Sequence, residues 1–354
     1  MGRPLSELDA VDWSALHHAY GDASDVPGLL RALGGTDEEA AEEAFGALFA
    51  ALCHQGSRFD ASAAAVPFLA GLLENPLADV PGLILLGRLA TGDDDQWSLP
   101  RPAEISGDPD LDPDALAAYE AVRREVPGLV GFLGDGDPYV VRAAAWALSW
   151  FPEEAGAVLP PLHDVLSSAP LPATRTTCLL AAALLGDRAL FSLPVPDGDW
   201  PYATAALLAL RDDPPAAVVD AVLDAARTLP KHAFQDDDIP YFYGDVPGVL
   251  ASALRCAPAA RRREAAVALT RLRQRTGHSF PIDAGLVHLL LEEAAATPGA
   301  HLSPLERAHL AALPRHAAHA YPGLLPHALH SLGLPDAFPD LASLLASRGL
   351  PSFP

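Results

Sequence analysis

The chain has 354 residues, of which 50% are hydrophobic, 19% charged and 7% aromatic, and its formal net charge is −23. So high an apolar content excludes an intrinsically disordered chain, because disorder accompanies low hydrophobicity. The charge argues against a general nucleic-acid binder, since phosphate contacts depend on Lys and Arg. Residues 1–120 hold 22 acidic and 5 basic residues (net −17), whereas residues 241–354 hold 8 and 10 (net +2). The acidic surface is therefore expected at the N-terminal end.

The cysteine content and the hydropathy of the sequence indicate the cellular compartment in which the protein is expected. Cys53, Cys178 and Cys256 lie far apart and are odd in number, so they form neither a disulfide framework nor a paired metal spacing. The first residues contain no apolar signal core, and no stretch is as long as a membrane span. We therefore expect a cytoplasmic protein with reduced thiols and no membrane partner.

Apolar residues recur at helical spacing through the first ninety residues. The tripeptide Val-Pro-Gly begins at Val26, Val80, Val126 and Val246, and Pro-Gly recurs at Pro322. Proline is tolerated in the first turn of a helix, and a preceding Asp can cap that turn, so each copy is expected to mark a helix start. The expected N-terminal helices cover about 12–20, 25–33, 37–54, 62–74 and 79–90.

The clearest repeat unit runs from about Val126 to Leu166. Its first helix is expected to end at residues 134–136, and Asp137-Pro138 opens a second helix that reaches Leu148. That second helix resembles the HEAT repeat, whose second helix reads D-x-x-V-R-x-x-A-x-x-A-L. Asp137 and Arg142 supply the polar positions, and the resemblance implies that they bridge adjacent repeats. The core-facing positions are expected to be Val140, Val141, Ala144 and Leu148.

Weaker helix pairs follow the same plan to the end of the chain. The copies of Pro-Gly at 127, 247 and 322 are spaced at close to multiples of about 40 residues, a period typical of two-helix repeats. The resemblance implies one all-α, right-handed α-solenoid over 1–354, with about seven or eight irregular units. Insertions at about 92–113 and 231–244 interrupt the array. The later pairs are expected at 160–166 with 173–185, 203–210 with 216–229, 248–254 with 259–273, 284–295 with 305–313, and 321–332 with 338–347.

The N-terminal region contains Trp13, Leu16, Tyr20-Gly21, His54-Gln55-Gly56 and Ala65-Val66-Pro67-Phe68-Leu69. This set is similar to a module in uncharacterised bacterial HEAT-repeat proteins. His54 and Gln55 fall where a helix should end, so His54 either caps the last carbonyls or contributes to a polar binding site. His17 could pair with Asp22 or Asp25 as an acid and base. No nucleophile, phosphate-loop or dinucleotide motif accompanies them, so no cofactor is expected. The candidate binding residues of this region are Trp13, His17, Tyr20, Asp22, His54 and Gln55.

The two insertions combine acidic and aromatic residues. In solenoids such insertions map to one edge, often the binding edge, and exposed aromatic side chains flanked by acid would suit a basic partner. The alternative is that the insertions pack locally onto the helices. The candidate contact residues are Trp97 in the first insertion and Phe234, Tyr241, Phe242 and Tyr243 in the second.

Three further clusters have an ordinary structural explanation besides a possible role as a binding site. Asp108 to Asp114 alternate like a calcium loop, but Pro113 and Tyr119 stand where an EF-hand needs Gly and Glu. Arginines crowd residues 261–275, either as a solvated helix face or as an anion patch. Six histidines lie between 301 and 330, but no Asp or Glu occurs between Glu306 and Asp336 and no cysteine lies near, so metal binding is not expected.

These observations favour a non-enzymatic protein–protein interaction module that uses the concave face and the insertions. A specific version is an immunity or regulatory protein for a basic partner, whose binding should weaken with salt. The alternative is an unorthodox enzyme or small-molecule binder in the solenoid groove near Trp13, His17 and His54. A HEAT-like DNA glycosylase is less favoured, because the first 240 residues lack a basic groove.

Overall fold

The computed structural model describes residues 2–92, 99, 112–168, 170–276, 281–286 and 289. These residues are α-helical and 3-10-helical, except for turns, loops and one short two-stranded sheet. They divide into two compact units. Unit 1 contains the described residues of 2–92, 112–190 and 237–244, and unit 2 contains those of 191–236 and 245–289 together with residue 99.

The chain begins without the helix expected at 12–20. Two 3-10 helices, η1 (Leu5–Ala10) and η2 (Trp13–Ala15), precede an antiparallel pair of strands, β1 (His17–His18) and β2 (Gly21–Asp22). The helix prediction was wrong because these backbone groups have other partners. The amide of His17 donates to Asp60 Oδ1 at 2.6 Å, and Gly21 adopts a φ of 134°, which an ordinary helical residue cannot.

The other expected helices of the N-terminal part are confirmed within a few residues. They are α1 (Val26–Leu33), α2 (Glu38–Leu52), α3 (Asp60–Leu72) and α4 (Asp79–Thr91). Asp37 caps α2 by accepting a hydrogen bond from the amide of Ala40 at 3.3 Å. The proline of the first Val-Pro-Gly lies in the first turn of α1, as expected. In α1, however, Asp25 makes no capping bond.

The third Val-Pro-Gly does not start a helix. Pro127 lies inside α6 (Pro113–Leu129), which continues into the 3-10 helix η4 (Val130–Gly134). The expectation of a helix start there was wrong, because a proline one turn from a helix end deprives that helix of only one hydrogen bond. The first helix of the clearest repeat unit is consequently longer than its sequence motif suggests.

The second helix of that unit, α7 (Pro138–Leu148), is buried on all sides from Val140 to Leu148. Asp137 accepts a hydrogen bond from the amide of Tyr139 at 2.8 Å and so caps its own helix. Arg142 instead reaches the next helix pair, where it donates to Thr174 Oγ1 at 3.3 Å. Unit 1 continues with η5 (Pro152–Glu154), α8 (Ala155–Ser167) and α9 (Pro172–Leu184).

Unit 2 contains α10 (Trp200–Ala209), α11 (Ala216–Thr228), α12 (Val246–Leu254) and α13 (Arg262–Thr276). Asp245 caps α12 through the amide of Gly248 at 3.0 Å, so the fourth Val-Pro-Gly does mark a helix start. The short helices are η6 (Leu190–Ser192), which spans the boundary between the units, η7 (Lys231–Ala233) and η9 (Ala259–Arg261). The helices expected at 305–313 and beyond lie outside the described residues.

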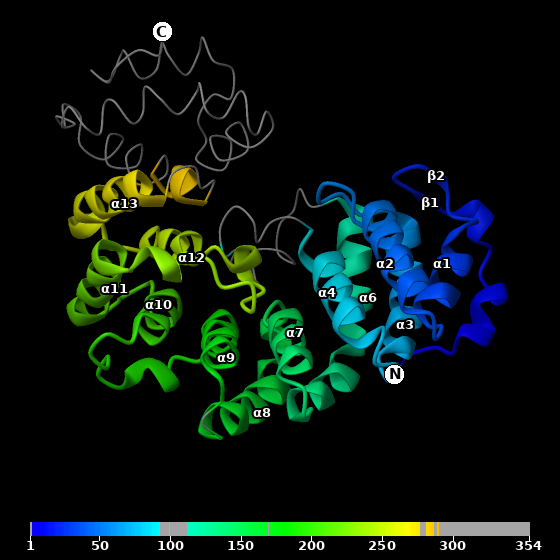
Figure 1. Ribbon diagram of the computed structural model, residues 1–354, viewed down its shortest axis with the longest axis horizontal. Helices are drawn as coiled ribbons and strands as arrows, with labels where there is room; N and C mark the ends of the chain where they lie inside the picture. The colour runs from blue at the N-terminus through cyan, green and yellow to red at the C-terminus, as the bar shows by residue number, and fades with distance from the viewer. Residues whose placement is uncertain are drawn as a thin grey trace, which may run out of the picture. The chain divides into compact units, whose positions relative to one another are not determined.

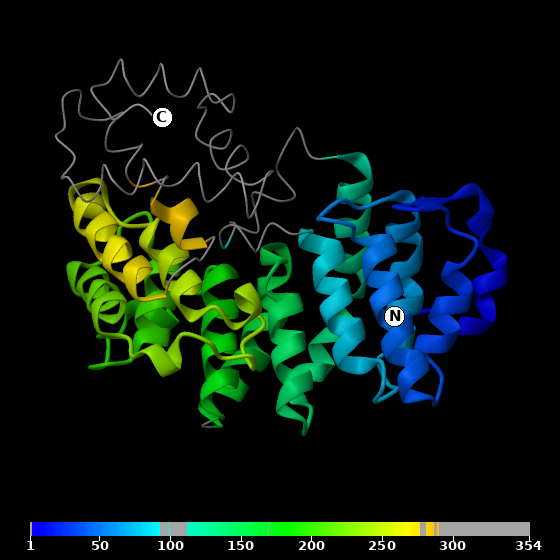
Figure 2. The ribbon, with the colours of Figure 1, turned by 45° about the horizontal axis from the view of Figure 1, so that its top comes forward.

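Helices that are close in sequence pack on each other within each unit. In unit 1, α1 packs on α2, α3 on α4 and α6, α4 on α6 and α7, and α7 and α8 on α9. Both ribbon views show α2, α3, α4 and α6 lying side by side (Figure 1 and Figure 2). In unit 2, α11 packs on α10, α12 and α13. The observed fold is therefore all-α, with packing that follows the order of the chain.

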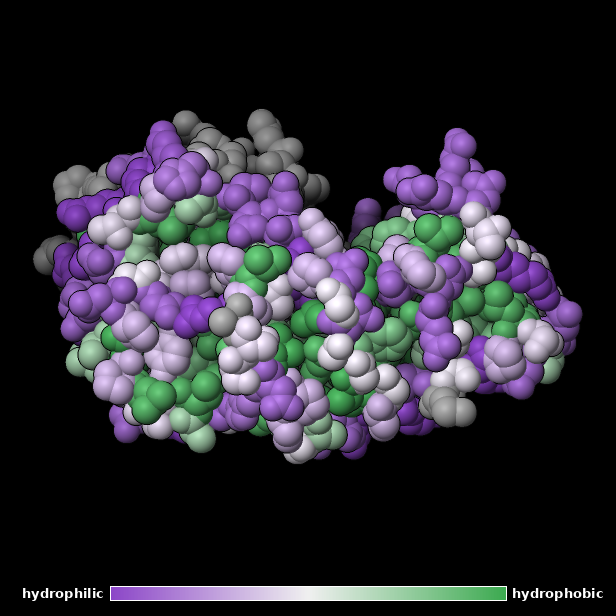
Figure 3. Space-filling model, turned by 60° about the horizontal axis from the view of Figure 1, so that its bottom comes forward, coloured by the Kyte–Doolittle hydropathy of each residue, from purple (hydrophilic) through white to green (hydrophobic). Residues whose placement is uncertain are grey.

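Aromatic side chains fill the core of unit 1. Trp146 and Trp150 meet edge to face with 6.0 Å between ring centroids, and Trp150 also contacts Tyr241 at 6.1 Å. Hydrophilic and hydrophobic side chains are interspersed over the face drawn in Figure 3, as is usual for protein surface. Within the described ranges, the structure contains no helix with both the length and the apolar character to cross a bilayer.

Candidate functional site

The structure separates the N-terminal set of candidate residues. Trp13 is buried, donates its indole N–H to the carbonyl of Leu8 at 2.9 Å and packs on Phe68. Its role is to hold η1 and η2 against α3. His17 lies on the exposed side of β1, with Nδ1 at 3.8 Å from Asp60 Oδ2. Asp22 is the cross-strand partner of His17 in the β1–β2 pair, but the carboxylate in ion-pair range of the His17 ring is that of Asp60.

His18, which the sequence did not single out, is the histidine that contacts Asp25. Its Nε2 lies 2.9 Å from Asp25 Oδ1, and its Nδ1 accepts a hydrogen bond from the amide of Tyr20 at 3.0 Å. Because Nδ1 is an acceptor, the imidazole proton of the neutral ring is on Nε2 and is donated to Asp25. The buried ring thus holds the β1–β2 turn against the start of α1.

Tyr20 and His54 meet on the surface beside this turn. The Tyr20 hydroxyl lies 3.3 Å from His54 Nδ1, and the two rings are edge to face with centroids 5.4 Å apart. Gln55 follows His54 with a φ of 48°. Asp22, in β2, accepts a hydrogen bond from the amide of Ser24, and no contact in the described part of the chain joins it to Tyr20 or His54. Among the described residues, no Ser, Thr or Cys side chain forms a hydrogen bond with His17 or His54.

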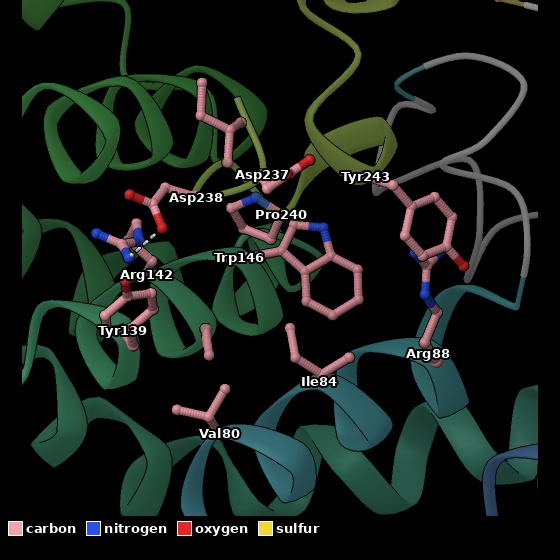
Figure 4. A pocket seen from close by; sticks show the side chains of 12 residues that line it. Val80, Ile84, Arg88, Tyr139, Arg142, Trp146, Asp237, Asp238, Pro240 and Tyr243 are labelled. Carbon is pink, nitrogen blue, oxygen red and sulfur yellow. Dashed lines mark hydrogen bonds and ion pairs between the residues drawn. The ribbon is translucent and has the colours of Figure 1, made fainter. Parts of the chain in front are cut away.

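A pocket of about 350 Å³ lies elsewhere in unit 1, between α4, α7 and the stretch 237–243. We call it the tyrosine pocket, because Tyr139 and Tyr243 stand in its wall with 55% and 56% of their surface exposed. Figure 4 shows Val80 and Ile84 on one side, the Asp237–Pro240 stretch opposite, and the indole of Trp146 between them. The pocket therefore combines an apolar floor with aromatic and charged groups.

Arg88 projects from α4 between two aromatic rings. Its guanidinium carbon lies 5.1 Å from the ring centroid of Trp146 and 4.7 Å from that of Tyr243. Both distances are within the range of cation–π attraction. Only 2% of Arg88 is exposed, so the positive charge is held in the pocket wall and out of bulk water.

Arg142 on α7 is the second buried cation of the tyrosine pocket. It lies over the ring of Tyr139 at 4.3 Å and is 3% exposed. Nη2 forms an ion pair with Asp238 Oδ1 at 3.1 Å, drawn as a dashed line in Figure 4. A charge so buried requires a partner, and Asp238 supplies it from a segment 96 positions away.

The backbone next to this segment is strained. Phe242 and Tyr243 both have a φ of 52°, and Gly244 follows at 80°. Non-glycine residues in this left-handed region cost about 1–3 kcal/mol each and persist only where the surroundings impose them. The turn buries Phe242 and leaves Tyr243 over Arg88. Its conformation thus shapes one wall of the tyrosine pocket.

The polar environment of the pocket is mixed. Trp146 is fully buried, and its indole N–H has no hydrogen-bond partner in the described part of the chain. Asp79 begins α4 one residue before Val80. Its pKa is raised above the ordinary value of 3.8, chiefly by burial and further by the charges of Asp135 and Asp137. The charged groups in the pocket lining itself are Arg88, Arg142, Asp237 and Asp238.

The second insertion largely packs onto the protein. Tyr241 is fully buried against Trp150, so it cannot serve as the exposed contact that the sequence predicted. Phe234 is partly buried, with the guanidinium of Arg275 at 5.4 Å from its ring. Of the candidates in 231–244, Tyr243 has the exposed aromatic side chain. Trp97 and most of the first insertion lie outside the described residues.

The arginine cluster of 261–275 is engaged within unit 2. Arg261 binds Asp220 at 2.6 Å and Glu264 at 2.8 Å, and Arg273 binds Asp283 at 2.7 Å. Arg275 donates to backbone carbonyls that include those of Arg227 and Leu229. These contacts give Arg261, Arg273 and Arg275 structural roles within unit 2. The six C-terminal histidines lie outside the described residues, within which no acidic, His or Cys group is arranged to hold a metal.

An acidic face on α2 is the second notable surface of unit 1. Glu38, Glu39, Glu42 and Glu43 are all exposed. Within the described residues, none of the four forms an ion pair.

No protein-family model matches the sequence, and a comparison with curated proteins finds no match. The resemblance to HEAT repeats therefore depends on the residues of α7 and on the recurring Val-Pro-Gly. The two candidate surfaces, the tyrosine pocket and the acidic face of α2, must be interpreted from their own chemistry.

Proposed function

We propose that the chain is a HEAT-like α-solenoid that works as a protein-interaction module for a basic partner. Packing in chain order and the link from Arg142 to the next helix pair support the repeat architecture. The excess of acid in the first third of the sequence supports the choice of partner. An immunity or regulatory protein that masks a cationic protein is the specific form that this charge fits.

The acidic face of α2 is the observation that carries the proposal. Glu38 lies four residues from Glu42, and Glu39 lies four from Glu43. Like charges at this spacing destabilise a helix by about 0.2–0.5 kcal/mol per pair. The helix dipole favours acid in the first turn, but Glu42 and Glu43 lie beyond it. A basic partner would relieve this repulsion and would be steered to the surface from solution.

The test is capture of partners from the native host's lysate by tagged full-length chain, at about 50 mM and about 300 mM salt. We expect a stoichiometric basic protein that is retained at low salt and lost at high salt. Replacing Glu38, Glu39, Glu42 and Glu43 by Gln should abolish its capture.

A matched control removes the same number of charges elsewhere. Asp164, Asp197, Asp213 and Asp224 are exposed and scattered over α8, α11 and loops, so their replacement by Asn should leave capture intact. Equal loss in both variants would show that only net charge matters. Binding that resists salt, or that survives in the glutamine variant, would refute the acidic face as the contact.

A further inference from the structure

We propose that a second pocket of unit 1 binds an aliphatic primary amine in its cationic form. The pocket has a volume of about 420 Å³, which falls within the range of small-molecule sites. It is formed by η4 and the loop after it, the first turns of α7 and α9, and one face of α8, which lie next to one another in Figure 1. We call it the aspartate pocket, because Asp135 and Asp164 are the charged residues in its lining. The site is independent of the protein contact assigned to α2.

The charge of the lining favours a cation. Asp135 lies in the loop between η4 and α7, and Asp164 lies on α8. Both residues are exposed, and among the described residues neither carboxylate forms an ion pair. No Lys, Arg or His side chain belongs to the lining. A cation in the pocket would therefore gain two carboxylate partners, whereas both would repel an anion.

The polar atoms of the lining favour a cation that carries N–H donors. Ser168 lies four residues after Asp164 and lines the pocket from the same face of α8. Its hydroxyl donates to the carbonyl of Val165 at 2.7 Å, so its oxygen remains an acceptor. With the two carboxylates, this oxygen supplies acceptors for the three N–H groups of a primary ammonium. A quaternary ammonium is disfavoured, because aromatic cages hold such groups and the lining contains no aromatic side chain.

The rest of the lining is largely apolar and suits an alkyl chain. Val141 on α7, Val165 on α8 and Leu171 at the start of α9 contribute to it. Leu171 has 59% of its surface exposed, so folding leaves this leucine largely in water. An alkyl chain that covered it would remove apolar surface from water, which is favourable. The aspartate pocket thus combines an acidic wall with an apolar one, as an aliphatic amine requires.

Hexylammonium is the probe for this proposal, because it joins a primary ammonium to a plain alkyl chain. Saturation-transfer NMR on the full chain near neutral pH, with a titration to obtain Kd, should detect its binding. Three analogues with the same chain should bind at least about fivefold more weakly: hexanol, which is neutral, hexanoate, which is anionic, and hexyltrimethylammonium, which lacks N–H donors. Equal binding of hexylammonium and hexanol, preference for hexanoate or hexyltrimethylammonium, or no binding of hexylammonium would overturn the proposal.

Two substitutions at exposed residues locate the site. Asp164→Asn should weaken hexylammonium binding by about fivefold or more, whereas Asp224→Asn, at an exposed position on α11, should leave it unchanged. Leu171→Ser should weaken binding by about two- to fourfold. Leu193→Ser removes a leucine of similar exposure from unit 2 and should have no effect. Wild-type affinity in Asp164→Asn would refute the assignment.

The amine site and the protein contact can be tested apart. The four-aspartate control of the capture experiment includes Asp164, so that variant should keep its protein partner and lose hexylammonium. The glutamine variant of α2 should lose the partner and keep hexylammonium. Failure of the amine site and failure of the protein contact are therefore distinguishable.

Discussion

Gly87 on α4 lies directly against the indole of Trp146 on α7. A Cβ atom at Gly87 would come within 2.1 Å of Trp146 Cζ3, closer than any real contact. The two helices therefore approach each other closely only because residue 87 has no side chain. Since Arg88 is the next residue and Trp146 lines the tyrosine pocket, this contact also sets the position of the pocket wall.

Gly87→Ala should destabilise the protein. The added methyl has no space unless Trp146 or the helix moves, and overpacking of this kind costs about 1–3 kcal/mol. The midpoint of thermal unfolding should fall by about 3–10 °C. Gly46→Ala is the matched control, because Gly46 lies on the exposed side of α2, where an added methyl would meet open space. It should stabilise by about 0.5–1 kcal/mol, since alanine is the better helix former. Equal effects of the two substitutions would contradict the close packing.

Asp238→Asn should be costly because it leaves Arg142 charged and buried without its acid. Asp238 is itself about half exposed, which moderates the loss, and we expect about 1–3 kcal/mol in the free energy of unfolding. Asp9→Asn breaks the comparable pair with Arg31, whose side chain is 48% exposed. That change should cost about 0–1 kcal/mol. Urea titrations of both variants provide the comparison, and a smaller effect at Asp238 would rule out the proposed burial of Arg142.

The three thiols should react very differently with a disulfide reagent. Burial raises the pKa of Cys178 to about 12, and Cys53 is also buried, whereas Cys256 is partly exposed. The thiolate is the reacting form, so native protein at pH 8 should show one fast-reacting thiol and unfolded protein three. Cys256→Ser should eliminate the fast reaction. A fast thiol that persists in this variant would mean that unit 1 opens readily around α2 or α9.

The raised pKa of Asp79 predicts that the stability of the protein depends on pH. Because its folded pKa lies above 3.8, its ionisation costs more in the folded state, and this penalty grows as pH rises from 3.8 through the folded pKa. Asp79→Asn should keep the acceptor for the Val80 amide and raise Tm at pH 7 by about 1 °C. The gain should shrink as the pH is lowered toward 3.8. Asp22 has a lowered pKa through its hydrogen bonds with Ser24, so Asp22→Asn should give no gain in Tm at pH 7.

Sequence patterns predicted most described helices because helical spacing and capping are local properties. The expected helix at 37–54 is α2 (Glu38–Leu52), which Asp37 caps. The helix predictions that were wrong failed because of the surrounding fold, which local sequence patterns do not reveal. Residues 12–20 form only the 3-10 helix η2 and not the expected helix, because Asp60, 43 positions after His17, accepts a hydrogen bond from the His17 amide. Identical tripeptides also differ in effect, since Val126-Pro127-Gly128 lies inside α6 while Val246-Pro247-Gly248 starts α12.

The tyrosine pocket could not be predicted from the sequence. Its walls come from residues 80–88, 139–146 and 237–243, and no local pattern indicates that these segments meet. The left-handed backbone of Phe242 and Tyr243 is equally hidden, because both residue types normally avoid that conformation. The aromatic residues at 241–243 were expected to be exposed contacts, but Tyr241 and Phe242 are buried and Tyr243 is exposed. Their partners, Trp150 for Tyr241 and Arg88 for Tyr243, emerge only from the fold.

Because residues 237–244 belong to unit 1, no single cut in the gene separates the two units. These eight residues are encoded after the start of unit 2 and are followed by more of unit 2. A truncation after Leu190 would therefore remove Asp238 from Arg142 and Tyr241 from Trp150, leaving an unneutralised arginine and an exposed indole. During synthesis on the ribosome, the same contacts form only after residue 244 has emerged, so the first unit to begin folding is not complete until much of the second has been made.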